Sequence, residues 1–453
     1  MTWTPTLPAA GGTMHARLTE ALAGDIASGA LKAGDRLPPQ RDLAHRLRVS
    51  IGTVTRAYSE AERRGLISGQ VGRGSFVAER APEDDAGPID LARNLPPALP
   101  LMQARLADGL SRIGRQAASL LDYAPSGGRA EHREAMARFL KASAHLSVSP
   151  DDIILTAGAQ QGTAVALAAI CRPGEAILAE EATFSGLKTL AEHMNYRLIP
   201  IALDAEGMDP ASLDRMADET GARAVYILPV QNPTARLMGA KRRADIVSVA
   251  RKRRLVLVED DIYAAYAPSS GLEPLALAAP ERVAYVTSLS KSLIPGLRVG
   301  VVVPPKAEGA FQRTLDALRA MTFGAPVIPA ALAADWVRSG AAEEIMHANV
   351  QAISARAALA VRVLGARIDP AALRTAPHLW LPMSELEAER VAGRAMRAGV
   401  SLTPPSAPYL EGVAVKGLRL CVGGPRDLAE LERGLNLLRA AFGDGAAQAR
   451  DVV

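Results

Sequence analysis

Short, continuously apolar runs of strand length recur through most of the chain, and polar segments rich in arginine separate them. Such runs predict strands buried on both faces, because a strand with one wet face alternates apolar and polar residues. Buried strands separated by helices indicate a mostly parallel sheet covered on both sides. The clearest runs are residues 152–156, 176–179, 224–228, 255–258, 283–286 and 299–303. This part of the chain is therefore predicted to form an α/β domain.

The first eighty residues follow a different pattern, in which three helical segments precede two short β runs. Apolar residues spaced by four give residues 13–28 one buried face, a second helix spans residues 39–47, and Ser50 caps a third. The β runs at 66–68 and 75–77 flank three glycines, which suits a hairpin. Helix, two-residue turn, helix and hairpin predict a winged helix-turn-helix whose third helix enters the DNA major groove. The alternative is a small helical domain of another kind.

Residues 80–90 hold two prolines, a glycine and an acidic run without any apolar period, which is typical of a linker. The last residues are small and polar, as in a frayed terminus. We therefore predict a winged helix-turn-helix head at residues 13–79, a linker at 80–90, an α/β body at 91–440 and a flexible tail at 441–453.

Composition narrows the class of protein. The 453 residues are 49% hydrophobic and 22% charged, which fits a globular chain of two or three domains. Two cysteines exclude a disulfide framework and are too few for a structural zinc site, so no metal is predicted. No apolar stretch is long enough to span a bilayer, and the first dozen residues lack Lys and Arg. We therefore expect a cytoplasmic protein with no signal peptide and no membrane partner.

The net charge of +4 is concentrated in the head. Residues 13–80 contain eleven Lys or Arg and seven Asp or Glu, an excess equal to that of the whole chain. A basic segment on a neutral body indicates a polyanion partner, although a solvated helical surface is the alternative. An arginine at the hairpin tip can reach a phosphate or a minor groove. The candidate DNA-binding residues are Arg41, Arg46, Arg48, Ser50, Thr53, Arg56 and Arg73.

In the body, the sharpest chemical signal surrounds Lys291. Ser288 and Ser290 precede this lysine in alternation, and Arg298 follows it by seven residues. Hydroxyls and a guanidinium together make a phosphate pocket. A lysine amine beside such a pocket can form a Schiff base with an aldehyde cofactor. Taken alone, the pattern also fits a surface lysine.

Three further motifs follow predicted strands. The glycine-bounded segment at 158–162 opens a helix, so its backbone N–H groups can bind phosphate. Asp260 ends a strand, where open α/β sheets bind ligands, and a carboxylate there can keep a pyridine nitrogen protonated. Asn232 follows another strand and can donate to a ring hydroxyl. Each motif alone also fits a helix cap or a turn, but their combination with Lys291 favours a cofactor site.

Within the head, the residues resemble a known family. Segments 31–38, 41–44, 53–58 and 72–77 are similar to the DNA-binding domain of the GntR family of bacterial repressors, over about residues 13–79. The resemblance implies binding to double-stranded promoter DNA. Two departures, Pro39 where the family usually has Ser and Ile51-Gly52 where Arg is common, leave the operator sequence open.

The body, over about residues 89–440, resembles the fold type I aminotransferases that use pyridoxal 5′-phosphate (PLP). The resemblance implies these roles: Lys291 for the Schiff base; Ser288, Ser290, Arg298 and the backbone of Ala159 and Gln160 for the phosphate; Asp260 for the pyridine nitrogen; Tyr263 and Asn232 for the ring hydroxyl; Phe184 stacked on the ring; Tyr123 for the phosphate of the partner subunit; Arg419 for an α-carboxylate. Two departures stand out: Ala235 replaces the usual Gly after Asn-Pro-Thr, and Phe184 replaces the usual Tyr.

A GntR-like head on an aminotransferase-like body is the arrangement of the MocR (GabR-like) transcriptional regulators. That resemblance implies a homodimer, commonly head-to-tail, with PLP at Lys291 and a small amine, an amino acid or PLP itself as the signal. Three hypotheses follow: a PLP-dependent regulator, a working aminotransferase with an accessory head, and a PLP-sensing regulator without an amine effector. The sequence leaves open the effector, the target genes, the sign of regulation and whether transamination turns over.

Overall fold

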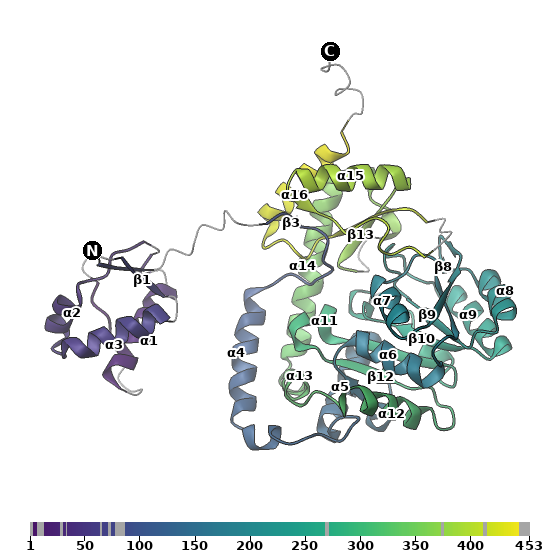
Figure 1. Cartoon of the computed structure of the whole chain (residues 1–453), viewed down its shortest axis with the longest axis horizontal. Coiled ribbons are helices and arrows are strands. Elements are labelled where there is room, and N and C mark those ends of the chain that lie inside the picture. Colours follow the sequence, from purple (N-terminus) through teal and green to yellow (C-terminus); the bar gives the residue numbers. More distant parts are fainter. Residues whose placement is uncertain are drawn as a thin grey trace, which may run out of the picture. The chain divides into compact units, whose positions relative to one another are not determined.

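The computed structural model describes residues 3–6, 13–27, 30–32, 34–63, 66–70, 74–77, 87–267, 271–372, 376–410 and 415–443. The chain divides into two compact units, Met1–Gly87 and Pro88–Val453, which correspond to the predicted head and body (Figure 1). Among the described residues, no helix is long and apolar enough to cross a membrane.

The head is a winged helix-turn-helix, as predicted. Its elements are α1 (Met14–Ala27), α2 (Gln40–Leu47), α3 (Ile51–Arg63) and the antiparallel strands β1 (Ile67–Gln70) and β2 (Gly74–Val77). Between α2 and α3, Arg48 adopts a left-handed conformation (φ 52°) that makes the tight turn. Leu18, Leu43, Val54 and Ala61 are almost fully buried and join the three helices in one apolar core. The hairpin tip with Arg73 lies outside the described residues.

The body is built on a seven-stranded sheet in the order β4-β12-β11-β10-β9-β5-β6. The strands are β4 (Ile154–Thr156), β5 (Ala176–Glu180), β6 (Arg197–Ile201), β9 (Ala224–Ile227), β10 (Val256–Asp260), β11 (Val283–Ser288) and β12 (Gly300–Val303). From β11 to β6 all neighbours are parallel, whereas β12 is antiparallel to both of its neighbours. The predicted mostly parallel sheet is confirmed. The sequence pattern missed β6, because this edge strand is only half buried along most of its length and contains Pro200.

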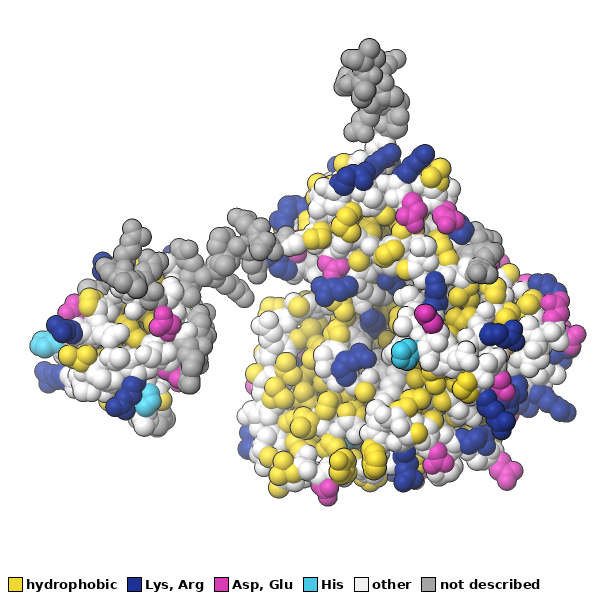
Figure 2. All heavy atoms as spheres, in the orientation of Figure 1, with side chains coloured by type: hydrophobic (Ala, Val, Ile, Leu, Met, Phe, Trp, Pro, Cys, Tyr) yellow, Lys and Arg dark blue, Asp and Glu magenta, His cyan; other side chains and the backbone are white. Residues whose placement is uncertain are grey.

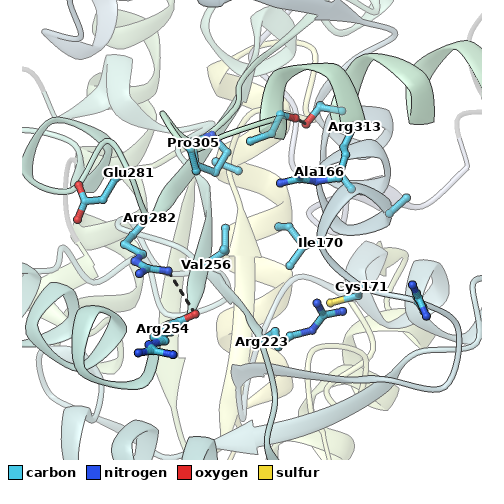
Figure 3. Close-up of a pocket in the computed structure, with 17 residues that line it drawn as sticks. Ala166, Ile170, Cys171, Arg223, Arg254, Val256, Glu281, Arg282, Pro305 and Arg313 are labelled. Carbon is cyan, nitrogen blue, oxygen red and sulfur yellow. Dashed lines mark hydrogen bonds between the residues drawn. The ribbon is translucent and has the colours of Figure 1, made fainter.

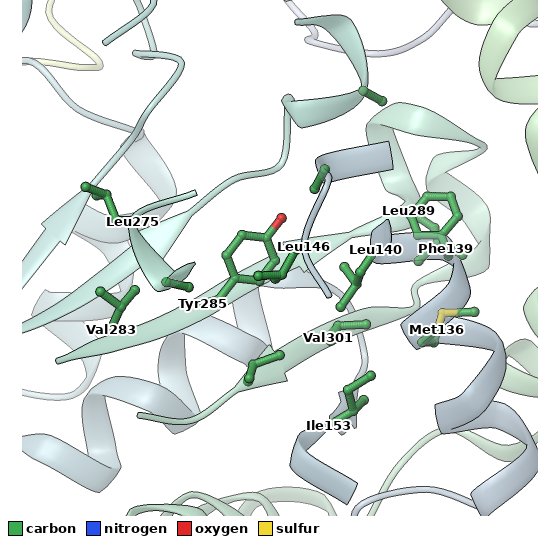
Figure 4. Close-up of a cluster of buried hydrophobic side chains, with 14 of the residues drawn as sticks. Met136, Phe139, Leu140, Leu146, Ile153, Leu275, Val283, Tyr285, Leu289 and Val301 are labelled. Carbon is green, nitrogen blue, oxygen red and sulfur yellow. The ribbon is translucent and has the colours of Figure 1, made fainter. Parts of the chain in front are cut away.

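Helices cover both faces of this sheet. One face packs on α5 (Ala130–Ala144), α8 (Pro210–Thr220), α9 (Ala240–Arg253) and α13 (Val327–Ser339), and the other packs on α6 (Ala159–Ile170), α7 (Ser185–His193) and α12 (Ala310–Thr322). Figure 4 shows Met136, Phe139 and Leu140 of α5 close to Tyr285 and Val301 of the sheet. Apolar cover on both faces explains why these strands read as continuous apolar runs.

A smaller lobe holds the C-terminal part of the body, with its own apolar core. It contains the long helix α14 (Ala341–Leu364), the antiparallel pair β13 (His378–Pro382) and β15 (Gly417–Cys421), and the helices α15 (Glu385–Arg397) and α16 (Leu428–Ala441). The remaining elements are α4 (Pro100–Gly114), β7 (Leu203–Asp204), β8 (Gly207–Met208), α10 (Leu275–Ala278) and α11 (Leu289–Ser292).

Two predicted boundaries change. The short strand β3 (Ile89–Asp90) pairs with β14 (Val400–Ser401), so residues 88–90 belong to the body and not to the predicted linker 80–90. A two-residue strand is too short to show an alternation of apolar and polar residues, and its partner strand lies about 300 residues further along the chain. The sequence pattern therefore could not predict it. Helix α16 ends at Ala441, so the predicted tail from residue 441 begins too early. Residues 78–86 and 444–453 lie outside the described residues.

Candidate functional site

A cavity of about 330 Å³ opens where β9, β10 and β11 end and α6 begins. The carboxyl ends of parallel strands are the usual ligand-binding edge of open α/β sheets. The structure brings together eleven of the twelve body residues predicted from sequence. The lining includes Ala159, Gln160, Phe184, Asn232, Asp260, Tyr263, Ser288, Ser290, Lys291, Arg298 and Arg419.

Lys291 lies in α11, immediately after β11, and its half-buried side chain lines the cavity. Its ammonium group donates a hydrogen bond to the backbone oxygen of Asn94. Burial lowers the pKa of Lys291 to about 8. A sizeable fraction of the side chain is therefore a neutral amine near neutral pH, and the neutral amine is the form that attacks a carbonyl carbon.

An anion cradle lies beside Lys291. Arg298 Nη1 donates to Ser290 Oγ at 3.3 Å, and its Nη2 donates to the Ala157 oxygen at 3.2 Å, near the start of α6. Gly158 precedes α6 with φ 91°, and a Cβ there would lie 2.6 Å from Arg298 Nη2. Glycine therefore lets the guanidinium approach the positive end of the helix, where backbone N–H groups bind phosphate. This cradle fits the phosphate group of a cofactor.

Asp260 ends β10 on the floor of the cavity. Its Oδ2 accepts a hydrogen bond from the Tyr226 hydroxyl at 2.5 Å, whereas its buried Oδ1 has no partner within the part of the chain that the structure describes. Burial raises the pKa of Asp260 to about 6. An unpaired buried oxygen requires a donor. The protonated nitrogen of a pyridine ring supplies one, so this carboxyl fits the PLP ring.

Sequence reasoning missed two residues around Tyr263: Asn94, which lines the cavity, and His378, which contacts both Asn94 and Tyr263. The Tyr263 hydroxyl accepts from Asn94 Nδ2 at 2.7 Å and from Asn232 Nδ2 at 3.4 Å. Asn94 also contacts His378 Nδ1 at 3.0 Å, and the His378 ring meets the Tyr263 ring edge-on at 5.3 Å. Asn94 and His378 are far in sequence from every motif, and only strand pairing places His378 opposite Cys421, two residues after Arg419. No local sequence signal therefore pointed to either residue.

Arg419, on β15, reaches the cavity from the smaller lobe. Its Nη1 donates to Asn232 Oδ1 at 2.9 Å and its Nη2 donates to Thr403 Oγ1 at 2.9 Å. The buried Nε has no partner among the described residues. A guanidinium that is held at both ends and keeps an unpaired Nε–H is suited to bind a carboxylate. Through Asn232, it is also connected to Tyr263.

Tyr123 does not line this cavity. Its side chain is 86% exposed and packs beside Phe323, with 6.3 Å between the ring centroids. The sequence resemblance gave Tyr123 a role toward the partner subunit, and within one chain the two rings form an exposed aromatic pair instead. The role of Tyr123 remains a prediction.

In the head, Arg41, Arg46, Arg48 and Arg56 are all exposed. Ser50 Oγ accepts the Thr53 backbone N–H at 3.2 Å, which caps α3 as the sequence indicated. Thr53 Oγ1 lies 2.9 Å from Ser50 Oγ, so the two hydroxyls share the exposed first turn of the helix. Arg73 lies outside the described residues.

Comparison with known proteins decides the family. Residues 88–436, more than three quarters of the chain, match the family described as aminotransferase class I and II. The chain belongs to this aminotransferase family. In the head, residues 15–77 match the family described as bacterial regulatory proteins, gntR family. The aminotransferase body, whose family uses PLP, is thus joined to a GntR DNA-binding domain, and the chain is a transcriptional regulator of the MocR arrangement.

Named relatives of this aminotransferase-family regulator match most of the chain or a large part of it. The uncharacterized HTH-type transcriptional regulator YdeF of Bacillus subtilis is 28% identical, over 98% of this chain and 97% of that protein. The probable rhizopine catabolism regulatory protein MocR of Rhizobium meliloti is 24% identical, over 95% and 94%. The vitamin B6 salvage pathway transcriptional repressor PtsJ of Salmonella typhimurium is 30% identical, over 63% and 66%.

Among solved structures, the fold of the body is similar to that of an archaeal alanine:glyoxylate aminotransferase. The TM-score is 0.72 at 22% identity, and the match covers 86% of this chain and 94% of that one. This likeness concerns the fold of the aminotransferase body.

Proposed function

We propose that this regulator senses a small amine or amino acid through Schiff-base chemistry at Lys291 and transmits the binding event to its head on promoter DNA. The observation that carries this proposal is that a reactive amine and an arginine able to bind a carboxylate share one cavity. Lys291 and Arg419 line the same cavity, and Arg419 keeps its Nε without a partner among the described residues.

Each residue of the cavity has a defined task in this proposal. When bound, PLP supplies an aldehyde that condenses with amines and a ring that withdraws electrons. Arg298, Ser290 and the start of α6 would hold its phosphate, and Asp260 Oδ1 would accept the pyridine N–H. Lys291 would supply the amine that anchors the cofactor, and Arg419 would bind the carboxylate of the effector. The neutral fraction of Lys291 near pH 8 favours condensation of its amine with the cofactor aldehyde.

A working aminotransferase with an accessory head is the second candidate. The same cavity holds a base, Lys291; a partner for the ring nitrogen, Asp260; and a carboxylate-binding group, Arg419. Together these groups are a complete set for transamination. The head argues for regulation, because catalysis does not need a DNA-binding domain. The name of PtsJ also keeps PLP itself as a candidate signal, in which case Arg419 would be dispensable.

A homodimer belongs to the proposal, commonly in a head-to-tail arrangement. Large apolar side chains are exposed on α4, on α13, at the end of α12 and in the loop that carries Tyr123: Leu110, Ile328, Phe323 and Leu121. Figure 2 shows apolar side chains gathered over α4 and α13 on one face of the body. Exposed apolar patches of this kind mark protein interfaces. In the proposed dimer a second copy covers this face, and Tyr123 keeps the role toward the partner's cofactor phosphate that the family resemblance implies.

The deciding experiment titrates the PLP-loaded protein with a panel of amines and amino acids. The visible spectrum reports chemistry at Lys291, and an electrophoretic shift on the gene's own promoter reports the head. One compound that changes both readouts at the same concentration supports the sensor. Steady-state transamination at about 1–10³ s⁻¹ with unchanged DNA binding would establish the enzyme instead. A response to PLP alone would favour the PLP-sensing alternative.

A further inference from the structure

A second cavity, of about 600 Å³, lies at the opposite end of the sheet strands (Figure 3). Val256 and Ala284 line it at the beginning of β10 and β11, whereas the cofactor cavity lies where these strands end. Helix α6 contributes to both cavities, with Ala159 at one and Ile170 at the other, a rise of about 16 Å. The second cavity is therefore separate from the cofactor site, and its volume is within the usual range of about 300–1,000 Å³ for small-molecule sites.

Arginine dominates the charged lining of this cavity. Five arginines stand against one acidic residue, Glu281, whose charge is paired with Arg251 at 2.8 Å outside the lining. Arg223 is paired with Glu175 at 2.7 Å. The four other arginines have no carboxylate within 4 Å in the described ranges: Arg172, Arg254, Arg282 and Arg313. Glu175 and Glu281 act on Arg172 and Arg282 only from farther away. Guanidinium groups gathered in excess over nearby carboxylates repel one another, so an anion among them is stabilised.

Helix ends explain only part of this cluster. Arg172 and Arg254 follow the carboxyl ends of α6 and α9, where a cation interacts well with the helix dipole. Arg282 stands before a strand and donates to the Arg254 oxygen at 3.5 Å. Arg313 lies in the first turn of α12, near the positive end of that helix, where a cation is unfavourable. The dipoles therefore do not account for Arg282 and Arg313.

Between the arginines, the cavity floor is apolar. Ala166, Ala169 and Ile170 from α6, together with Val256 and Pro305, form this floor. Figure 3 shows Ile170 and Val256 between Arg223, Arg282 and Arg313, which come from three different parts of the fold. The combination calls for a ligand with two or more negative charges and a flat apolar body.

We propose that this cavity binds a small multivalent oxyanion that carries an aromatic ring, of the nucleoside phosphate class. Arginine forks bind phosphate oxygens in pairs, and the alanine-rich floor leaves room for a ring. The site is independent of Lys291 and would give the regulator a second small-molecule input.

The test uses the full-length, PLP-saturated protein and isothermal titration calorimetry with ATP, inorganic pyrophosphate and citrate. ATP is expected to bind with a dissociation constant below about 1 mM and more tightly than the two ringless anions. Arg254→Gln and Arg282→Gln should each weaken ATP binding by about tenfold or more, the usual loss for a charged hydrogen bond. Ala169→Phe fills the floor without changing charge and should reduce ATP affinity to that of pyrophosphate.

One control separates this site from other basic surfaces. Arg397→Gln removes an exposed arginine of α15 and should leave ATP affinity unchanged. Retention of the PLP absorbance shows that each variant is folded. The proposal is overturned if no probe binds at about 1 mM, if the cavity variants keep wild-type affinity, or if ATP binds no better than pyrophosphate. Should Arg282→Gln fail to fold, Arg254→Gln and Ala169→Phe decide the matter.

Discussion

Tyr226 donates its hydroxyl hydrogen to Asp260 Oδ2 at 2.5 Å, from the strand adjacent to that of Asp260. This bond occupies one carboxyl oxygen and leaves Oδ1 as the buried oxygen without a partner in the described part of the chain. Tyr226 therefore fixes the orientation of Asp260, the proposed partner of the cofactor's ring nitrogen. Tyr226 also favours the ionised form of Asp260, because burial raises the pKa of this carboxyl whereas the bond from Tyr226 lowers it.

The first prediction concerns Tyr226→Phe. Losing this bond should raise the pKa of Asp260 further above its present value of about 6, so that less of the carboxylate is ionised at pH 7. Affinity for PLP should fall by about tenfold, the usual loss for a hydrogen bond to a charged group, and more at pH 6 than at pH 8. PLP release followed by absorbance at both pH values measures this effect.

Tyr285→Phe is the matched control. Tyr285 is also fully buried in the sheet and donates to Asp261 at 3.1 Å, but neither residue lines the cofactor cavity. This variant should lose stability without the pH-dependent loss of PLP. Equal PLP affinities for wild type and Tyr226→Phe would contradict the assigned role of Tyr226.

Asp260 and Lys291 could be found from the sequence because each lies just after an apolar run, within a short group of polar residues that fits cofactor binding. Tyr226 could not, because it lies inside such a run and counts there as one more apolar residue. Asn94 and His378 were missed for another reason: they meet across 284 residues of sequence, and only the packing of the smaller lobe brings them to Tyr263. Local patterns predicted the sheet and the cofactor motifs, whereas tertiary contacts decided how the cavity is closed.

The second prediction uses the pH dependence of Lys291. Burial lowers the pKa of its amine to about 8, so the neutral form increases as the pH rises through 8. At pH 7 roughly a tenth of the side chain is then neutral, against about one part in three thousand for an ordinary lysine of pKa about 10.5. Capture of PLP by the apoprotein should accelerate between pH 7 and 9 with a midpoint near 8, as stopped-flow absorbance would show.

Lys291→Ala supplies the control for that measurement. The variant should be colourless, whereas borohydride should remove the visible band of wild type and fix the cofactor to Lys291. A wild-type protein that takes up no PLP from a millimolar supply would refute the assignment of the whole body.

The third prediction distinguishes affinity from specificity in the head. DNA affinity should fall by about 10³–10⁵ between 50 and 200 mM salt if about six to ten phosphates are neutralised by the dimer. Arg56→Ala should weaken binding to all sequences and lower the salt slope by about one per head. Thr53→Ala should relax sequence preference instead, because its hydroxyl stands in the exposed first turn of α3. Fluorescence anisotropy on specific and scrambled promoters separates the two effects, and identical behaviour of both variants would contradict it.

The fourth prediction concerns the exposed aromatic pair. Phe323→Asp should convert the dimer to monomers in analytical ultracentrifugation. The substitution replaces a large apolar side chain, 80% exposed in the single chain, with a charge that the proposed interface would bury. Tyr123→Phe should keep the dimer and weaken PLP binding by about tenfold, since only the phenol reaching the partner's phosphate is lost. Leu428→Asp, at an equally apolar exposed position on α16, should leave both properties unchanged. A Phe323→Asp dimer of wild-type affinity would place the interface elsewhere.

The last prediction tests how the effector is recognised. Arg419 holds Asn232 and Thr403 with its two terminal nitrogens, and its Nε has no partner among the described residues. If an amino acid is the signal, Arg419→Ala should abolish both the spectral change and the promoter response to it. PLP should still bind, but a few-fold more weakly, because Asn232 loses the group that orients it beneath Tyr263. Thr403→Val removes one orienting bond and keeps the charge, so it should weaken the response only in part, while DNA affinity without effector stays at the wild-type value in both variants. A full amino-acid response in Arg419→Ala would show that the carboxylate is bound elsewhere, or that the signal is an amine without a carboxylate.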